Sequence, residues 1–239
     1  MRLAQYIAKC GVCSRRNASR LIDEGRVMVD GMEAGHLSFI HGGEDVLVNG
    51  ELISEVDAAY YLYNKPVGID CNLDVNDPAS LIHYLPSQEQ RLFPVGRLDK
   101  DSCGLLLLTN HGEVANHLLS PEFKKPKHYL VTVEVSHANK QLGRVALNQG
   151  FIDGMNLPLN IKGKWTTLCE INIVDKLQFE ITLTQGLNRQ IRRMCANQGF
   201  KVVHLQRTHF AGLALDDLAQ GEYRKLDSAI FSQSIIQAG

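Results

Sequence analysis

Apolar residues near the start of the chain recur at helical spacing and predict a small first module. They mark one helix around residues 3–7, which Gly11 ends, and a second over residues 15–24, which Ser14 can cap. Two short β-type runs then lead into dipeptides that are typical of tight hairpin turns, Asp30-Gly31 and Asn49-Gly50. The pattern therefore predicts two helices and two hairpins within residues 1–54.

A short polar stretch, residues 54–59, separates this module from a longer part of the chain that is rich in strand patterns. We expect strands over 60–63, 92–95, 106–110, 129–134, 168–175 and 177–185, and helices over 81–85, 112–119, 140–149 and 189–195. Many strands with few helices between them are typical of an α+β domain. The second domain is therefore predicted over residues 60–239, on a mixed, mostly antiparallel β-sheet with flanking helices.

Length and composition are those of a globular protein. The 239 residues, 44% of them hydrophobic, can supply a sizeable core. No apolar run approaches the ~18 residues of a membrane span, and the first residues lack the apolar core of a signal peptide, so we expect a cytoplasmic protein with no membrane contact. The six cysteines are scattered and should be reduced thiols; the C-x-x-C pair at 10 and 13 lacks further ligands for a metal.

The net charge of −1 conceals two basic stretches. Residues 1–26 carry six Lys or Arg against two acids, and residues 186–208 carry five against none. In the first stretch, the arginines could form an ordinary solvated face of the module. Few acids stand one helical turn away to pair with them, however, so the phosphates of a nucleic acid are a more natural counter-charge. The arginines concerned are Arg15, Arg16, Arg20 and Arg26.

A polar cluster at residues 96–105 lies between two apolar runs that are typical of buried strands. Gly96 and Gly104 allow the backbone to turn and to approach other groups closely. Asp99 stands beside Arg97, whose charge favours the carboxylate form, and it could serve as a nucleophile, a base or an electrostatic stabiliser. We expect Asp101, two positions on, to point to the opposite side. The residues alone also allow a purely structural ion-pair network at the end of a strand.

The second informative stretch, residues 184–195, places three cations on one face of a predicted helix. At 100° per residue, Arg189, Arg192 and Arg193 lie together, and the apolar side chains of the same helix lie opposite. Since the stretch contains no acids, these cations need partners elsewhere. They could cap carbonyl groups, pair with distant carboxylates or bind a substrate.

Four stretches together resemble the successive motifs of the RsuA-type pseudouridine synthases. Residues 96–105 match the family's central motif, G-R-L-D-x-x-S/T-x-G-L, at every fixed place, and the other three are Lys65-Pro66-Val67-Gly68, Lys127-His128-Tyr129 and residues 188–194. The wording at 185–190 and 205–208 is most similar to the RluF branch, which acts on large-subunit ribosomal RNA. Residues 2–53 resemble the RNA-binding domain named after small-subunit ribosomal protein four.

This resemblance implies an RNA pseudouridine synthase that needs neither a metal nor another cofactor and acts as a monomer. The aspartate matching Asp99 is the catalytic residue of the family, the tyrosine matching Tyr129 contacts the uracil ring, and the arginine matching Arg192 pairs with the aspartate. The chemistry is consistent, because breaking the N1–C1′ bond calls for a carboxylate near the sugar, and the base must leave its stack. Further RNA contacts are expected from Arg97, Arg189, Lys65 and the arginines of the first module.

Several alternatives stay open on the sequence. A non-catalytic RNA-binding or ribosome-assembly factor would need only the basic patches. A retaining glycosidase would need two carboxylates about 5–5.5 Å apart, and Asp99 with Asp101 is the nearby candidate pair. The same isomerisation could also act on small-subunit ribosomal RNA or on transfer RNA. The letters leave open whether Asp99 attacks C1′ or removes the proton from C2′.

Overall fold

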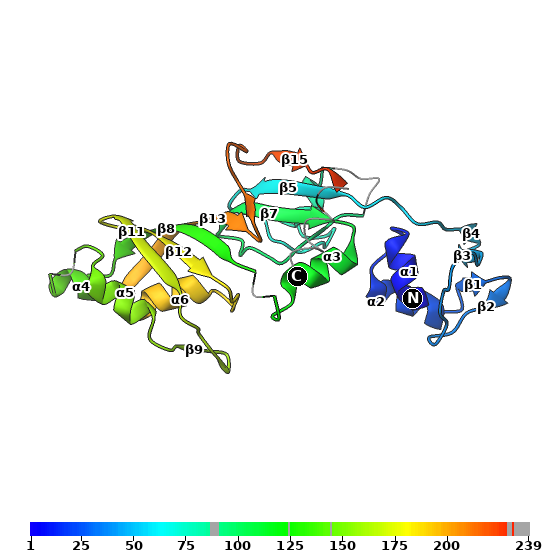
Figure 1. Cartoon of the computed structure of the whole chain (residues 1–239), viewed down its shortest axis with the longest axis horizontal. Coiled ribbons are helices and arrows are strands. Elements are labelled where there is room, and N and C mark those ends of the chain that lie inside the picture. Colours follow the sequence, from blue (N-terminus) through cyan, green and yellow to red (C-terminus); the bar gives the residue numbers. More distant parts are fainter. Residues whose placement is uncertain (87–90, 124, 144, 229–230, 232–239) are drawn as a thin grey trace.

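The chain forms three lobes in a row (Figure 1), and its computed structural model describes residues 1–86, 91–123, 125–143, 145–228 and 231. The N-terminal lobe comprises residues 1–53. The central lobe is built around the strands β5 (Tyr60–Lys65) and β7 (Cys103–Thr109). The distal lobe contains β12 (Gln178–Leu183) and α6 (Gln190–Asn197). The end of the predicted second domain, residue 239, lies outside the described residues.

The N-terminal lobe packs two helices against a small antiparallel sheet. Its helices are α1 (Leu3–Lys9) and α2 (Arg15–Asp23), and Oγ of Ser14 accepts a hydrogen bond from the Asn17 amide at the start of α2 (3.1 Å). The sheet has the order β2-β1-β3-β4 and consists of β1 (Val27–Val29), β2 (Met32–Glu33), β3 (Val46–Val48) and β4 (Glu51–Leu52). Side chains from both helices and from β1 and β3 share one core. The predicted helices and hairpins are therefore confirmed.

One mixed sheet of nine strands runs through the central and distal lobes. Its main path has the order β11-β12-β8-β13-β7-β5-β15, with β6 paired to β7 and β14 paired to β13. The remaining strands are β6 (Phe93–Pro94), β8 (Lys127–Val135), β11 (Glu170–Asp175), β13 (Phe200–Phe210), β14 (Leu213–Ala214) and β15 (Tyr223–Lys225). Of the pairings in this sheet, β7 with β13 is parallel and the others are antiparallel. The predicted α+β class with a mostly antiparallel sheet is confirmed.

The parallel pair of β7 and β13 forms the seam between the two halves of this sheet. It pairs only two positions, Gln206 with Cys103 and Arg207 with Gly104. Gly104 has a φ of +102°, and a Cβ on it would lie within 3.0 Å of three backbone atoms of Arg207. Only glycine fits such a close approach of two backbones. The seam therefore depends on the last glycine of the 96–105 cluster.

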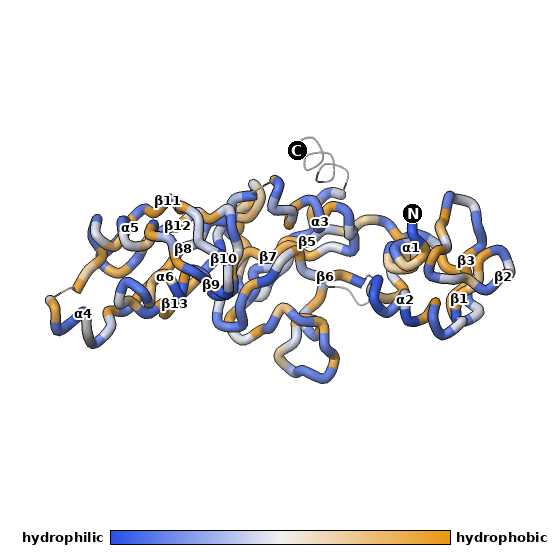
Figure 2. The backbone as a smooth tube through the Cα atoms, turned by 90° about the horizontal axis from the view of Figure 1, so that it is seen from below, coloured by the Kyte–Doolittle hydropathy of each residue, from blue (hydrophilic) through white to orange (hydrophobic). Residues whose placement is uncertain are grey.

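Helices cover the sheet differently in the two lobes. In the distal lobe, α5 (Gln149–Met155) and α6 share a core with one face of β8, β12 and β13. In the central lobe, α3 (Gly112–Leu119) covers the face of β7 that carries Leu105 and Leu107. Leu106 and Leu108 enter a second core on the opposite face, together with the 3-10 helix η1 (Leu81–Tyr84). Hydrophobic and hydrophilic residues alternate along the chain in each lobe (Figure 2). Within the described residues, no helix is long and apolar enough to cross a membrane.

Three sequence expectations differ from the structure. The helix expected over 140–149 is wrong: α4 (His137–Gln141) ends two residues into that range, and α5 starts only after Asn148, whose Oδ1 accepts from the Phe151 amide (3.1 Å). The strand expected over 92–95 is reduced to the two residues of β6. The long strand β13 was not anticipated. A short hairpin of β9 (Asn160–Ile161) and β10 (Lys164–Trp165) extends from the distal lobe.

Candidate active site

A cleft with a volume of about 1330 Å³ opens beside the seam of the sheet. Its walls come from both halves: the loop before β7, the end of α3, the strands β8 and β13, and the segment that leads into α6. Asp99, Arg97, Tyr129 and Arg189 all line it. The structure therefore brings the predicted catalytic aspartate and tyrosine to one cavity, although they lie thirty positions apart in the sequence.

Asp99 is held by a turn and not by an extended strand. The Ser102 amide donates to the carbonyl of Asp99 (3.0 Å), and the Gly68 amide donates to the carbonyl of Lys100 (2.7 Å). Leu98 is buried just before it, and the side chain of Asp99 is about one-third exposed, at 35%. The expectation that Asp99 and Asp101 point to opposite sides is wrong: residues two apart share a face even on an extended chain, and in this turn both carboxylates approach Arg189.

Arg189 joins the two carboxylates. Its Nη1 and Nη2 donate to Oδ1 and Oδ2 of Asp101 (2.9 and 2.7 Å), and its Nη1 lies 3.9 Å from Oδ2 of Asp99. The paired hydrogen bonds favour the charged forms, so they hold the pKa of Asp101 below its ordinary value and raise the pKa of Arg189. This bidentate geometry is the strong form of an Arg–carboxylate contact.

Arg192 contacts Asp101 and not Asp99, so the predicted ion pair between Arg192 and Asp99 is wrong. Nη2 of Arg192 donates to the carbonyl of Asp101 (2.7 Å) and to Oγ of Ser102 (3.1 Å), and Nη1 donates to the carbonyl of Val202 (3.2 Å). Nε lies 3.4 Å from Oδ2 of Asp101, which is an ion-pair contact without a hydrogen bond. The side chain is only 12% exposed, and burial lowers the pKa of the guanidinium. Arg192 thus clamps the turn that carries Asp99.

The expected face of three arginines on α6 is also not formed. Arg189 is the residue before the helix and has a left-handed backbone conformation, with a φ of +52°. The direction of its side chain therefore does not follow from the 100° spacing of helical residues. Arg192 is largely buried, and Arg193 is exposed and donates to Oδ1 of Asn188 (3.3 Å). Ile191, Met194 and Cys195 fill the buried side of the helix, as predicted, and Gln190 is buried with them.

Tyr129 lies on β8, opposite Arg207 of β13 and Ile181 of β12. It is half-buried and packs against the cores on both sides of the seam. Within the described ranges its hydroxyl has no hydrogen-bond partner. The ring is therefore supported from behind and can present one face and its hydroxyl to a group in the cleft.

Lys65 is not placed to bind RNA, which corrects the sequence expectation. Its side chain is fully buried, and Nζ donates to the carbonyls of Pro66 (2.7 Å) and Ile69 (2.8 Å). Burial lowers the pKa of this ammonium group. Lys65 therefore fastens the loop that follows β5. Arg97, in contrast, is exposed at the edge of the cleft, where a phosphate can reach it.

The arginines of the N-terminal lobe differ among themselves. Arg15, Arg16 and Arg20 are exposed along α2 and form no ion pair within the described residues. Arg26 donates from Nε to Oδ1 of Asn49 (2.7 Å) and pairs with Glu24 (3.2 Å), so its guanidinium is already engaged within the lobe. The three helical arginines are therefore exposed cations of this lobe without an ion-pair partner among the described residues.

Cysteine and metal chemistry are not indicated by the described residues. All six cysteines are free thiols. The described part of the chain contains no group of three or more His, Cys, Asp or Glu side chains that could hold a metal ion.

Several known pseudouridine synthases are similar to this chain along most of its length. Residues 59–197 match the family of RNA pseudouridylate synthases, and residues 1–47 match the S4 domain. The chain is 38% identical to the dual-specificity RNA pseudouridine synthase RluF of Escherichia coli, over 95% of this chain and 75% of that protein. It is 35% identical to the ribosomal large subunit pseudouridine synthase B of Bacillus subtilis, over 94% and 91% respectively. The crystal structure of a pseudouridylate synthase is similar to this chain with a TM-score of 0.67 and 26% sequence identity, and the match covers 100% of each chain.

Proposed function

The chain belongs to the RNA pseudouridylate synthase family, and from this premise we propose that Asp99 is the residue on which its chemistry depends. The enzyme isomerises uridine to pseudouridine in RNA. This breaks the N1–C1′ bond, turns the base and joins it again through C5. A carboxylate beside the sugar can attack C1′ or remove the proton from C2′, and both routes require the ionised form.

The observation that carries this proposal is the setting of Asp99 in the cleft. Among the described residues that line the cavity, Asp70 and Asp99 are the two carboxylates, and Asp99 is the one within ion-pair distance of Arg189, in the cavity that Tyr129 also lines. Arg189 reaches it at 3.9 Å without a bidentate grip, since Asp101 occupies the fork of the guanidinium. Asp99 thereby stays within ion-pair distance of a cation and keeps its oxygens accessible to the substrate.

Tyr129 is proposed to receive the uracil after it leaves the RNA stack. An aromatic ring offers an extruded base a new stacking surface, and the hydroxyl can relay a proton. The position of Tyr129 on a strand with a packed rear face supports this role, because a preorganised ring loses little freedom when it binds the base.

The proposed substrate is a uridine in large-subunit ribosomal RNA, and the proposed location of the protein is the cytoplasm, where this RNA is found. The support comes from the Bacillus subtilis relative, whose name specifies a pseudouridine synthase of the large ribosomal subunit. Small-subunit ribosomal RNA and transfer RNA are the alternative substrates. Residues 1–54 are proposed to be an RNA-binding domain, with Arg15, Arg16 and Arg20 facing phosphates, and residues 60–239 to be the catalytic domain.

The test replaces the two cleft carboxylates separately. RNA labelled with tritium at uracil C5 releases the label only when the base is rejoined through C5, so an RNA-binding factor or a glycosidase gives no signal. We expect Asp99→Asn to keep its thermal midpoint and RNA affinity and to release tritium at no more than a few per cent of the wild-type rate. Asp70→Asn, the matched control, should keep most of the activity. A folded Asp99→Asn protein with substantial turnover would overturn the proposal.

A further inference from the structure

Arg207 is a buried cation in the wall of the catalytic cleft. It is 2% exposed, and its Nε donates to the carbonyl of Leu105 across the seam (2.7 Å). Its guanidinium carbon lies 4.9 Å from the ring centroid of Phe210. Nη2 of the same group is shielded from solvent and has no hydrogen-bond partner within the described residues. A buried guanidinium normally has acceptors for its donors, so this one indicates a missing partner.

Lys127 is a second cation at the same place. Its Nζ lies 5.6 Å from the ring centroid of Phe210 and donates to the carbonyl of Lys125 (3.3 Å). Burial lowers the pKa of Lys127, and the nearby charge of Arg207 lowers it further. Within the described ranges neither Lys127 nor Arg207 forms an ion pair with a carboxylate. Two like charges thus lie over one aromatic ring, and no carboxylate of the described residues pairs with either of them.

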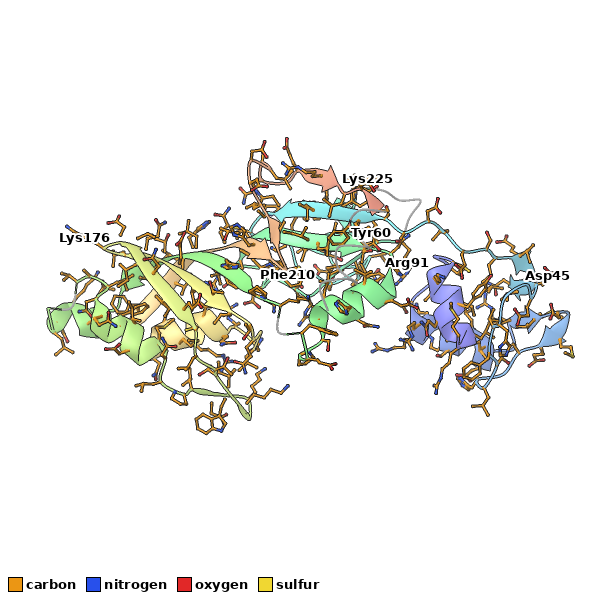
Figure 3. All side chains as sticks on the ribbon, viewed as in Figure 1. Asp45, Tyr60, Arg91, Lys176, Phe210 and Lys225 are labelled. Carbon is orange, nitrogen blue, oxygen red and sulfur yellow. The ribbon has the colours of Figure 1, made fainter. Side chains whose placement is uncertain are left out.

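The two cations stand next to the residue proposed to hold the base. Arg207 is the cross-strand partner of Tyr129, and Lys127 is two positions before Tyr129 on the same strand, so the three side chains project from one face of the sheet. All three line the cleft. Phe210, which supports both cations, lies where the central and distal lobes meet (Figure 3). Among the described lining residues, two carboxylates face seven cations: Arg97, Lys100, Lys125, Lys127, Lys164, Arg189 and Arg207.

We propose that Arg207 and Lys127 form a binding site for a phosphodiester group of the RNA, on the wall of the cleft beside Tyr129. The inference rests on the proposed function, since it assigns to this site the backbone next to the flipped nucleotide. A guanidinium presents parallel donors that match two phosphate oxygens, and an ammonium group supplies a further charge. A uracil carbonyl could occupy Nη2 but would leave both charges uncompensated, so the pair of cations favours the anion.

The site fixes the substrate by its backbone while Tyr129 and Asp99 act on its base and sugar. A phosphate held by Arg207 and Lys127 limits the position of the ribose that follows it. The extruded base is then directed toward Tyr129, and the sugar toward the wall that carries Asp99. Binding energy from a group that does not react is thereby used for orientation, which is the usual way in which enzymes bring reactants together.

The experiment measures RNA binding against salt concentration, with the full-length protein in an Asp99→Asn background so that no turnover occurs. The probe is a transcript of large-subunit ribosomal RNA. Lys127→Met keeps the alkyl stem on Phe210 and removes the charge, whereas Lys127→Arg keeps the charge. Lys176→Met is the matched control, because Lys176 lies at the far tip of the distal lobe (Figure 3). Arg207→Met is less informative, since Arg207 also bridges the seam.

We expect Lys127→Met to weaken binding several-fold and to reduce the magnitude of the log–log salt slope by about 0.7 to 0.9, which is the value for one lost phosphate contact. Lys127→Arg should restore the slope, and Lys176→Met should leave it unchanged. An unchanged slope in a Lys127→Met protein with a normal thermal midpoint would overturn the inference, and so would weaker binding at an unchanged slope, which indicates a contact to the base. Because tritium release is not measured, failure here is distinguishable from failure of the role proposed for Asp99.

Discussion

Replacement of Gly104 by alanine should destabilise the protein more than a glycine-to-alanine substitution usually does. The added Cβ would lie within 3.0 Å of the N, C and O atoms of Arg207, and none of these backbone atoms can move without disturbing β13. The φ of +102° adds strain of about 1 to 3 kcal/mol, and forcing an extra carbon into a packed site typically adds about 1 to 3 kcal/mol. We expect a loss of about 2 to 6 kcal/mol in the free energy of unfolding, out of a total of about 5 to 15 kcal/mol for a typical protein.

Gly221→Ala provides the control for this prediction. Gly221 has a similar φ of +86°, but a Cβ there would meet nothing within 4 Å, so only backbone strain of about 1 to 2 kcal/mol should appear. Guanidinium denaturation followed by circular dichroism gives both losses, and single-turnover tritium release reports the site. If Gly104→Ala is destabilised no more than Gly221→Ala, the close packing of the seam is not what requires glycine.

Three further outcomes follow from the site. Tyr129→Phe should bind RNA normally but lose most of its single-turnover rate; an unchanged rate in a folded variant removes the hydroxyl from the chemistry. Asp101→Asn should slow turnover by freeing Arg189. Arg189 lowers the pKa of Asp101, so their ion pair stabilises the folded protein at pH values above the pKa of the unfolded carboxyl. This stabilisation is lost as the pH falls through the pKa of Asp101 in the folded protein. The thermal midpoints of wild type and Asp101→Asn should therefore converge in acid. Deleting residues 1–54 should flatten the salt slope of RNA binding and raise KM on large RNA, and equal slopes would refute the anchor role.

Secondary structure was predictable from the sequence where its signals are local. The second helix was recognisable from Ser14 and its apolar stripe, and the hairpins from Asp30-Gly31 and Asn49-Gly50, because each signal spans only a few residues. Strand β13 carries no such signal. Its ladder with β8 shifts register twice, between Val202 and His204 and again between Arg207 and His209. Each shift breaks the alternation of buried and exposed positions on which strand prediction depends.

The sequence predicted which catalytic residues lie together in the cleft, but not which side chains contact each other there. The motif match placed Asp99 and Tyr129 in one site, and the structure brings them to one cavity. The partner of Arg192 was assigned incorrectly, because the direction of Asp101 depends on a turn closed by the Ser102 amide, and residue types alone do not specify that turn. The direction of Arg189 depends in the same way on a left-handed backbone at a residue other than glycine, which is uncommon. Arg207 was passed over, since nothing in its sequence neighbourhood marks it as buried.

The location of the cleft at the seam couples the stability of the enzyme to its chemistry. The two halves of the sheet meet through only two paired positions, and one of them joins Gly104 to Arg207. The segment before Gly104 carries Asp99, and the strand opposite Arg207 carries Tyr129. Arg192 adds a second tie, because it starts from α6 in the distal lobe and holds the turn at Asp101 and Ser102 in the central lobe. Any shift between the halves therefore changes the spacing of Asp99 and Tyr129 directly, so substitutions at the seam should lower the turnover rate even where the protein remains folded.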